Sequence, residues 1–432
     1  MQRIRSPEVP AHAGSIIHIC GWVHAVRRLG SITFLIVRDG WGLVQVVIET
    51  QPGAAPMDPP GAESIVGVCG LVAANAAAPG GHEIQNPVIT VIETAEAPAI
   101  ALGKRQLGCG LATLLDQAVV LNRHPQRRAL LRLASAAMEG FRATLRARHF
   151  TEIQTPKLVG TATEGGSEVF TVDYFGRPAY LAQSPQFYKQ IMVGVFERVF
   201  EVGPVFRAEP SDTIRHLSEY VSMDVEFGFI TDHGTVMELL REVIAAVIGG
   251  IAEQCGQDID LLGLTMPTVP AAIPALHFTE AKEIAFQRTG MDARQEIDLA
   301  PQEERALGTW AVETHGSDFL FVTGYPMAKR PFYTHPDQTR PAYSNSFDLL
   351  FRGLELVTGG QRLHRHADYI AALTARGIDP AGFSAYLSAF RHGMPRHGGF
   401  AIGLERLVMQ LAGVANIRLA TAFPRDVGRL SP

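Results

Sequence analysis

The chain has 432 residues, which is too many for one hydrophobic core and predicts two or three domains. Apolar residues make up 47% and charged residues 19%, which excludes a disordered chain, and a net charge of −5 excludes an overall basic field. The four cysteines lie far apart without a CxxC pair, which argues against a disulfide framework or a zinc site. No stretch resembles a signal peptide or reaches the roughly 18 apolar residues of a membrane span. We therefore expect a cytoplasmic protein without a membrane partner.

Residues 16 to 95 contain five short runs rich in Val, Ile and Thr, separated by turns, which predict short strands. Five strands in roughly 80 residues favour an OB-type barrel, so we expect residues 1–96 to form an all-β domain. Aromatic and basic side chains on one wall of such a barrel suit stacked, unpaired bases, although each aromatic alone is more often a core residue. The candidates are Trp22, His24, Arg27, Arg28, Phe34 and Gln45.

Residues 97–126 are rich in Ala, Pro and Gly and are expected to be a linker. Its basic residues form a modest patch of a kind that is usually a solvated face. A long helix is then predicted from Arg127, because apolar residues recur at three- and four-residue spacing between Ala134 and Leu145. The run TEIQTP follows as a predicted strand that stops at Pro156.

The densest group of charges lies on a predicted antiparallel hairpin, RVFEVGPVFRAE and EYVSMDVEFGFI, joined by a polar loop. A hairpin of the core has no use for so many charges. A site that holds a polyphosphate and discriminates a base does. The charged residues are Arg207, Glu209, Arg215, His216, Glu219, Asp224 and Glu226.

A second hairpin is predicted in SNSFDLLFRGLELVTGGQR, with its turn at Arg352-Gly353. In that register Leu350 faces Glu355, and Asp348 shares their face. Two carboxylates on one face suit a divalent cation that also touches phosphate, but they are equally consistent with two solvent-facing acids.

Between the two hairpins, residues 232–318 begin with a predicted helix and continue as mixed helix and loop, which we interpret as a small insertion. FLFVTGYP then predicts a strand, and two helices follow the second hairpin. The last predicted element is a glycine-rich strand, HGGFAIG, that passes directly into a helix. Near the start of that helix, Arg406 needs an anionic or stacking partner. His364 and His366 form an HxH pattern, which without further ligands is rarely a metal site.

Together these elements resemble a class II aminoacyl-tRNA synthetase over nearly the whole chain. Three motifs occur in the order typical of that family: a long helix with a strand ending in Pro156, the hairpin with FRAE at Phe206, and the glycine strand with GLER at Gly403. Each motif is weak alone, and their order behind an N-terminal barrel makes the match specific. The resemblance implies an α+β fold, with an antiparallel sheet and flanking helices in residues 127–432 behind an OB-fold anticodon-binding barrel.

Within this class the chain resembles aspartyl-tRNA synthetases of the compact archaeal type. In QSPQFYKQ, Lys189 matches a lysine that meets the side-chain carboxylate of the substrate, where asparagine enzymes usually carry an apolar residue. In GGQRLHRH, Arg362 matches an arginine that binds the same carboxylate. Such a clamp rejects an uncharged amide, because the buried cations would be left underpaired.

The resemblance implies that aspartate and ATP form aspartyl-adenylate, whose aspartyl group passes to the 3′ end of tRNA, with Mg²⁺ as the metal. Catalysis is then positioning and charge neutralisation without a protein nucleophile. The residues implied for catalysis are Arg207 and Arg406. Those implied for ATP are Arg207, Glu209, Arg215, His216, Tyr220, Glu355 and Arg406. Those implied for aspartate are Glu164, Gln186, Lys189, Asp224 and Arg362, with His397 lining the same pocket. Those implied for Mg²⁺ are Asp348 and Glu355.

For the tRNA anticodon the resemblance implies His24, Arg27, Phe34, Gln45 and Pro87. Archaeal-type enzymes that are strictly specific for tRNA(Asp) tend to have Trp where this chain has His24, and Lys near Pro87. At these positions the chain resembles non-discriminating enzymes, which also charge tRNA(Asn) and pass the product to an amidotransferase. The implied partners are therefore tRNA(Asp), tRNA(Asn), an amidotransferase and a second copy of the chain, which would pair through the first motif.

Three alternatives remain at this point. One is a strictly tRNA(Asp)-specific enzyme, and another is an asparaginyl-tRNA synthetase, against which Lys189 argues. The third is a non-catalytic tRNA-binding paralogue, which should have lost Arg207, Glu355 or Arg406.

Overall fold

The computed structural model describes residues 1–50, 58–160 and 168–432. The chain divides into two compact units, Met1–His124 and Pro125–Pro432. Glu164, which the sequence analysis assigns to aspartate binding, lies outside the described residues. Among the helices of the described ranges, none combines the length and the apolar character that a membrane crossing requires.

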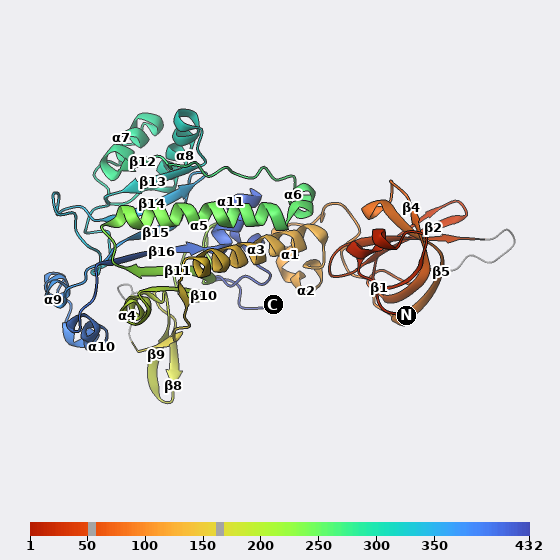
Figure 1. Cartoon of the computed structure of the whole chain (residues 1–432), viewed down its shortest axis with the longest axis horizontal. Coiled ribbons are helices and arrows are strands. Elements are labelled where there is room, and N and C mark those ends of the chain that lie inside the picture. The colour runs from red at the N-terminus through yellow and green to blue at the C-terminus, as the bar shows by residue number, and fades with distance from the viewer. Residues whose placement is uncertain (51–57, 161–167) are drawn as a thin grey trace. The chain divides into compact units, whose positions relative to one another are not determined.

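The first unit contains a closed barrel with the strand order β1-β2-β3-β5-β4 (Figure 1). Its interior is apolar and includes Leu35 and Val46, so the neighbouring Phe34 and Gln45 face outward by the alternation of strand side chains. The predicted all-β barrel is confirmed. Its strands are β1 (Ile16–Leu29), β2 (Ile32–Arg38), β3 (Leu43–Glu49), β4 (Ile65–Ala74) and β5 (His82–Glu93).

The segment expected to be a linker contains two short helices, α1 (Leu111–Asp116) and α2 (Ala118–Leu121). It is tied to the barrel by Arg123, which donates to the Glu63 carboxylate at 2.8 Å. The same carboxylate receives two bonds of 2.9 Å from the buried Arg38. Because these contacts join residues far apart in the chain, the local composition gave no sign of them.

The second unit is built on an eight-stranded sheet with the order β12-β13-β14-β15-β16-β11-β10-β6 (Figure 1). Neighbouring strands are antiparallel except at β12–β13 and β6–β10. The predicted antiparallel sheet with flanking helices is confirmed. The strands are β6 (Thr151–Glu152), β10 (Arg198–Phe206), β11 (Glu219–Gly228), β12 (Ala275–His277), β13 (Phe319–Thr323), β14 (Ser346–Phe351), β15 (Leu354–Gln361) and β16 (His397–Gly403).

A separate three-stranded sheet has the order β7-β9-β8 and extends away from the large sheet (Figure 1). Its strands are β7 (Leu158–Val159), β8 (Thr171–Tyr174) and β9 (Arg177–Leu181). The predicted strand TEIQTP is therefore shorter than expected, since only Thr151–Glu152 pairs with the large sheet.

Two long helices, α3 (Pro125–Ala147) and α5 (His233–Gln254), lie side by side along the large sheet (Figure 1). They approach closely at Gly140, where an added Cβ would lie 3.3 Å from the Cα of Val247. Although α5 falls within the stretch interpreted as an insertion, its apolar face belongs to the central core. An 8-residue-spaced apolar face of this kind can be buried only against another element, so this helix is part of the main layer.

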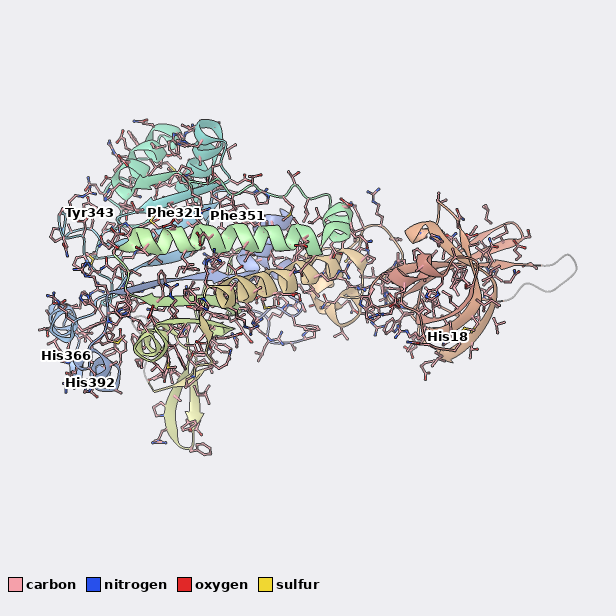
Figure 2. The ribbon with its side chains drawn as sticks, viewed as in Figure 1. His18, Phe321, Tyr343, Phe351, His366 and His392 are labelled. Atoms are coloured by element: carbon pink, nitrogen blue, oxygen red, sulfur yellow. The ribbon has the colours of Figure 1, made fainter. Side chains whose placement is uncertain are left out.

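The remaining helices frame the ends of the sheet. Aromatic side chains fill the space between β13, β14 and β15, where the rings of Phe319 and Phe351 stack with centres 4.6 Å apart and Phe321 packs edge-on against Phe347; Figure 2 labels Phe321 and Phe351. These helices are α4 (Gln186–Phe196), α6 (Gly256–Leu262), α7 (Phe278–Thr289), α8 (Pro301–His315), α9 (His366–Ala375), α10 (Ser384–Ser388) and α11 (Leu404–Ala412).

Candidate active site

Strands β15, β16 and β11 lie side by side and form the floor of a cavity of about 340 Å³. Thr358, Ala401 and Asp224 occupy one row across these three strands. The middle strand carries small residues, and at Gly399 an added Cβ would lie 2.4 Å from a carboxylate oxygen of Glu226. Small residues on β16 therefore leave room for the acidic side chains of β11.

The hairpin of β10 and β11 supplies one side of the cavity, as predicted, although β10 ends at Phe206 and the RAE residues already belong to the loop. Alternation along β11 sends one set of side chains into the core, including Met223 and Val225. The opposite set faces the site and consists of Tyr220, Ser222, Asp224 and Glu226.

The cavity brings together most of the residues that the sequence analysis assigned to catalysis, ATP and aspartate. Two assigned residues are not among those that line it: Glu164 lies outside the described residues, and Asp348 is buried behind the wall. The assigned residues that line the cavity are Gln186, Lys189, Arg207, Glu209, Arg215, His216, Tyr220, Asp224, Glu355, Arg362 and Arg406.

Two cations and two anions meet at the inner end of the cavity. The Lys189 Nζ lies 3.0 Å from Asp224 Oδ1 and 3.4 Å from Glu226 Oε2, and the Arg362 Nε lies 3.1 Å from Glu226 Oε1. All four side chains are buried. Burial alone would raise the pKa of Glu226, but Arg362 and Lys189 hold it below its ordinary value. We call these four residues the charge quartet.

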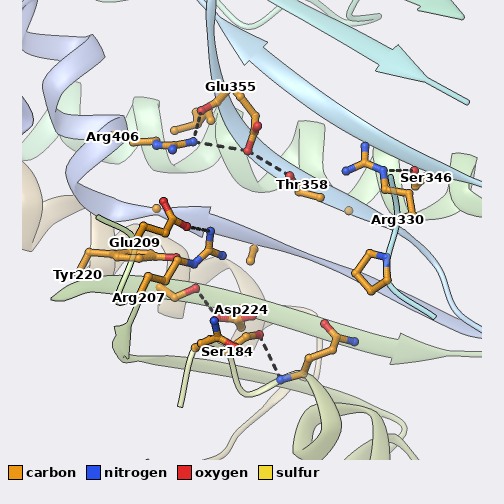
Figure 3. A pocket seen from close by; sticks show the side chains of 18 of the residues that line it. Ser184, Arg207, Glu209, Tyr220, Asp224, Arg330, Ser346, Glu355, Thr358 and Arg406 are labelled. Atoms are coloured by element: carbon orange, nitrogen blue, oxygen red, sulfur yellow. Dashed lines mark hydrogen bonds and ion pairs between the residues drawn. The ribbon is translucent and has the colours of Figure 1, made fainter. Parts of the chain in front are cut away.

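Residues of the hairpin surround the middle of the cavity (Figure 3). The guanidinium carbon of Arg207 lies 5.6 Å from the ring centre of Tyr220, and Arg207 Nη1 lies 3.8 Å from Glu209 Oε1. The His216 Nε2 lies 3.9 Å from the other oxygen of Glu209. Burial and the positive charge of Arg406 lower the pKa of His216, so this ring is mainly neutral at pH 7.

Helix α11 brings Arg406 to Glu355, across the cavity from the hairpin (Figure 3). The Arg406 Nη1 donates to the backbone carbonyl of Glu355 at 3.0 Å and lies 3.5 Å from its Oε1. The side chain of Glu355 is 39% exposed, into the cavity that it lines. Although burial opposes it, Arg406, Arg330 and Arg207 hold the pKa of Glu355 below its ordinary value.

The second hairpin has the predicted register, because Leu350 pairs with Glu355. Its turn residues Arg352 and Gly353 both have positive φ, at 49° and 72°. Asp348 is buried, and one of its oxygens accepts a 2.9 Å bond from Arg330. Burial raises the pKa of Asp348 to about 6.

A cation site made only of protein groups does not occur in the part of the chain that is described, since no cluster of three His, Cys, Asp or Glu could hold a metal. Glu355 faces the cavity, whereas Asp348 is occupied by Arg330. Mg²⁺ typically binds one or two carboxylates together with phosphate oxygens and water. The donor set therefore fits a magnesium ion that arrives with a polyphosphate.

The histidines singled out in the sequence are structural. His397 is fully buried and does not line the cavity; its Nε2 accepts from Gln190 at 2.9 Å, and its Nδ1 lies 2.9 Å from the carbonyl of Pro395. His366, labelled in Figure 2 at the start of α9, accepts from Arg391 at 3.2 Å. The expectation that His397 lines the amino-acid pocket is not met.

Three buried residues of this region received no role from the sequence. Glu226 stands two residues after Asp224, so strand alternation could have placed it on the same face. Arg330 and Glu304 come from segments without a recognisable pattern, and only the fold brings them to Asp348 and Arg215.

On the barrel, the residues assigned to the anticodon fall into two groups. Arg27 and Phe34 are cross-strand partners, and Gln45 lies on the same outer wall, where its amide donates to Glu83 at 2.9 Å. His24 sits at an irregularity of the β1–β2 pairing, is 7% exposed, and lies 3.3 Å from Arg38 Nη1. Pro87 follows Asn86, whose φ is 49°, at a second irregularity, between β4 and β5.

Comparison with protein families finds two matches, which together cover most of the chain. Residues 111–427 match the family described as tRNA synthetases class II (D, K and N). Residues 17–92 match the family described as OB-fold nucleic acid binding domain.

Similar proteins include the aspartate–tRNA(Asp/Asn) ligases of Thermus thermophilus and Aeropyrum pernix. The first is 47% identical, with all of both chains covered, and the second is 40% identical, with 97% of this chain and 96% of the other covered. Among solved structures, asparaginyl-tRNA synthetase from Pyrococcus horikoshii complexed with asparaginyl-adenylate has a TM-score of 0.92 at 30% identity over all of both chains. Aspartyl-tRNA synthetase from Entamoeba histolytica has a TM-score of 0.87 at 30% identity, covering all of this chain and 93% of the other.

Proposed function

The chain belongs to the class II tRNA synthetases of the D, K and N group, and from this premise we propose that it is an aspartate–tRNA ligase. It forms aspartyl-adenylate from aspartate and ATP and transfers the aspartyl group to the 3′ end of tRNA. The charge quartet is the observation that carries the choice of aspartate. Lys189 and Arg362 present two buried cations at the inner end of the cavity, where a side-chain carboxylate can be recognised.

Selection of aspartate over asparagine follows from burial. A carboxylate that reaches Lys189 and Arg362 receives two charge-assisted hydrogen bonds. An amide would present two N–H donors to cations that need acceptors, and the cost of leaving buried polar groups underpaired is large. Asp224 and Glu226 keep both cations oriented before the substrate arrives.

The first chemical step needs no nucleophile from the protein, because the α-carboxylate of aspartate attacks the α-phosphorus of ATP and pyrophosphate leaves. Arg207 neutralises charge on the α-phosphate, and Arg215, His216 and Arg406 hold the outer phosphates. Glu209 and Tyr220 bind the adenine. All of these side chains line the one cavity that also contains the charge quartet, which places both substrates within reach of each other.

A magnesium ion bound with the triphosphate would be held by Glu355, with Asp348 behind it. When bound, such an ion supplies charge neutralisation at the phosphate oxygens. Arg330 keeps Asp348 in place through a 2.9 Å bond and donates to Ser346 at 2.9 Å.

The second step uses tRNA(Asp), and we extend the proposal to tRNA(Asn). His24 and Pro87 support the wider specificity, since they stand where strictly specific enzymes carry larger or charged residues, and the similar ligases named above carry both tRNAs in their names. The product on tRNA(Asn) would pass to an amidotransferase. The proposal also includes a homodimer formed through α3 and β6, in the cytoplasm.

The test is to charge tRNA(Asp) and tRNA(Asn) transcripts with labelled aspartate and, separately, with labelled asparagine. Aspartylation of both transcripts is expected. Failure to aspartylate either transcript would overturn the main proposal, and failure with tRNA(Asn) alone would overturn only the wider specificity.

A second candidate, asparaginyl-tRNA synthetase, is favoured by one observation, the TM-score of 0.92 to an enzyme of that name. The same experiment separates the two, because that candidate requires labelled asparagine to reach tRNA(Asn). Two buried cations at the side-chain end of the pocket oppose it.

A further inference from the structure

Glu304, on the first turn of α8, is a buried acid directed at the phosphate end of the cavity. Its residue is 5% exposed, and its Oε2 accepts a 3.0 Å bond from Arg215 Nη1. The backbone N–H of Glu355 donates to the same carboxylate, and Arg406 is its other charged neighbour. A buried carboxylate is retained only where its partners offset the loss of hydration, so this position has a specific purpose.

The helix that carries Glu304 is fixed against the second hairpin. At Gly308 an added Cβ would lie 2.5 Å from the Cα of Gly353, and at Gly353 an added Cβ would lie 2.9 Å from the Cα of Arg305. Such close backbone approach on both sides leaves α8 little room to slide. Glu304 therefore acts from a rigid support.

The loop that carries Arg215 is held at its backbone by a different segment. The Arg418 Nη1 donates to the carbonyl of Thr213 at 3.1 Å, and its Nη2 donates to Asp212 at 2.6 Å. The backbone N–H of Ile417 donates to the carbonyl of Ile214 at 2.8 Å. These contacts fix the path of the loop but leave the long side chain of Arg215 undirected.

We propose that Glu304 is a positioning residue for ATP binding, which aims the guanidinium of Arg215 at the outer phosphates. This inference rests on the proposed function. Within the described part of the chain, Nη1 is the only nitrogen of that guanidinium with a protein partner. A guanidinium has five N–H donors in a rigid fork, so one edge binds Glu304 while another binds phosphate.

Preorganisation is the physical gain. A free arginine loses about 2 kcal/mol of rotamer entropy when it is immobilised, and a side chain already held by a carboxylate loses less of it on binding ATP. The arrangement also keeps Arg215 from pairing with the carboxylate of Glu355, which must remain open toward the phosphates and their cation. Glu304 thus directs one cation without blocking the site.

The experiment measures the KM for ATP and the KM for aspartate by aspartate-dependent ATP–pyrophosphate exchange, together with ATP binding by calorimetry. The first variant, Glu304→Gln, retains an acceptor for the Glu355 N–H but removes the charge. The second, Glu304→Asp, retains the charge but shortens the side chain by one methylene. Glu313→Gln is the matched control, because Glu313 is on the same helix and pairs with Arg288 at 2.6 Å on the surface.

We expect both Glu304 variants to raise the KM and the Kd for ATP about tenfold, with the KM for aspartate within about twofold of the wild type. In an Arg215→Ala background, Glu304→Gln should have no further effect on ATP binding, because the two residues act as one unit. Unchanged ATP binding in both variants would overturn the inference, as would a parallel rise of both KM values. Calorimetry reads ATP affinity even if exchange is absent in the wild type, a result that would count against the proposed function alone.

Discussion

Lys189 stands in an unfavourable place for a lysine. It lies in the first turn of α4, where the helix dipole favours negative charge, and it is 1% exposed. Neither local helix formation nor packing explains a buried cation there. Asp224 and Glu226 offset its desolvation, and the position makes sense as part of a site that recognises an anion.

Replacing Lys189 by Met keeps the volume and removes the charge. The substrate carboxylate then loses a partner, and Asp224 and Glu226 share only Arg362. We expect Lys189→Met to lower kcat/KM for aspartate about a hundredfold or more in ATP–pyrophosphate exchange, with a much smaller change in the KM for ATP. Lys157→Met is the control, since Lys157 also pairs with a buried glutamate, Glu201, at 2.7 Å but does not line the cavity. Equal loss in both variants would argue against a role in substrate selection.

Glu405 predicts a pH dependence of stability. Its carboxylate accepts from the backbone N–H of Val221, and burial raises its pKa from the ordinary value of 4.5 to about 7. The folded state therefore favours the protonated form, so its stabilisation is fully present below pH 4.5 and is lost as pH rises through 7.

Glu405→Gln removes this titration, so its stability relative to the wild type should increase between pH 5 and pH 8, by about 3 kcal/mol at most. Urea unfolding at the two pH values measures the difference. Glu253→Gln, at an exposed glutamate, should show no such trend. A constant difference between Glu405→Gln and the wild type would show that Glu405 does not titrate in this range.

At the level of elements, the two hairpins that line the site were readable from the sequence. Their alternating side chains and the Arg352-Gly353 turn depend on neighbours in the chain, and the register followed. What the sequence did not reveal depends on distant partners. Arg330 reaches Asp348 from a loop, Glu304 reaches Arg215 from another helix, and Arg123 ties the expected linker to Glu63. No local pattern encodes such pairs.

The turn at Gly353 makes a prediction of its own. Its φ of 72° favours glycine, and an added Cβ would lie 2.9 Å from the Cα of Arg305 in α8. Gly377 has a similar φ of 69° but open space around its Cβ position. Gly353→Ala should therefore destabilise the protein by about 1–3 kcal/mol more than Gly377→Ala, as measured by urea unfolding. Equal destabilisation would mean that only backbone conformation matters at the turn.

For the whole molecule, the two compact units have separate cores, and the site residues for aspartate and ATP all belong to the second. A change on the outer wall of the barrel should therefore leave the first chemical step intact. We expect Phe34→Ala to lower kcat/KM for tRNA about tenfold or more, in line with the loss of one base–aromatic stack, with unchanged ATP–pyrophosphate exchange.

Trp41→Ala is the control for that experiment, because Trp41 is an exposed aromatic of the same barrel outside the wall of Arg27, Phe34 and Gln45. A loss of exchange activity in Phe34→Ala would contradict the separation of the two tasks. Equal loss of tRNA charging in both variants would contradict the assignment of the wall.

The charge quartet also constrains how this pocket could evolve. Its two cations and two anions balance, so any single substitution that removes a charge leaves a buried remainder without its counterpart. A lineage that exchanged aspartate for a neutral substrate would have to replace a cation and an anion together, or pass through a destabilised intermediate. The amino-acid specificity of this chain is therefore protected by a fitness barrier that a pocket lined by independent side chains would not possess.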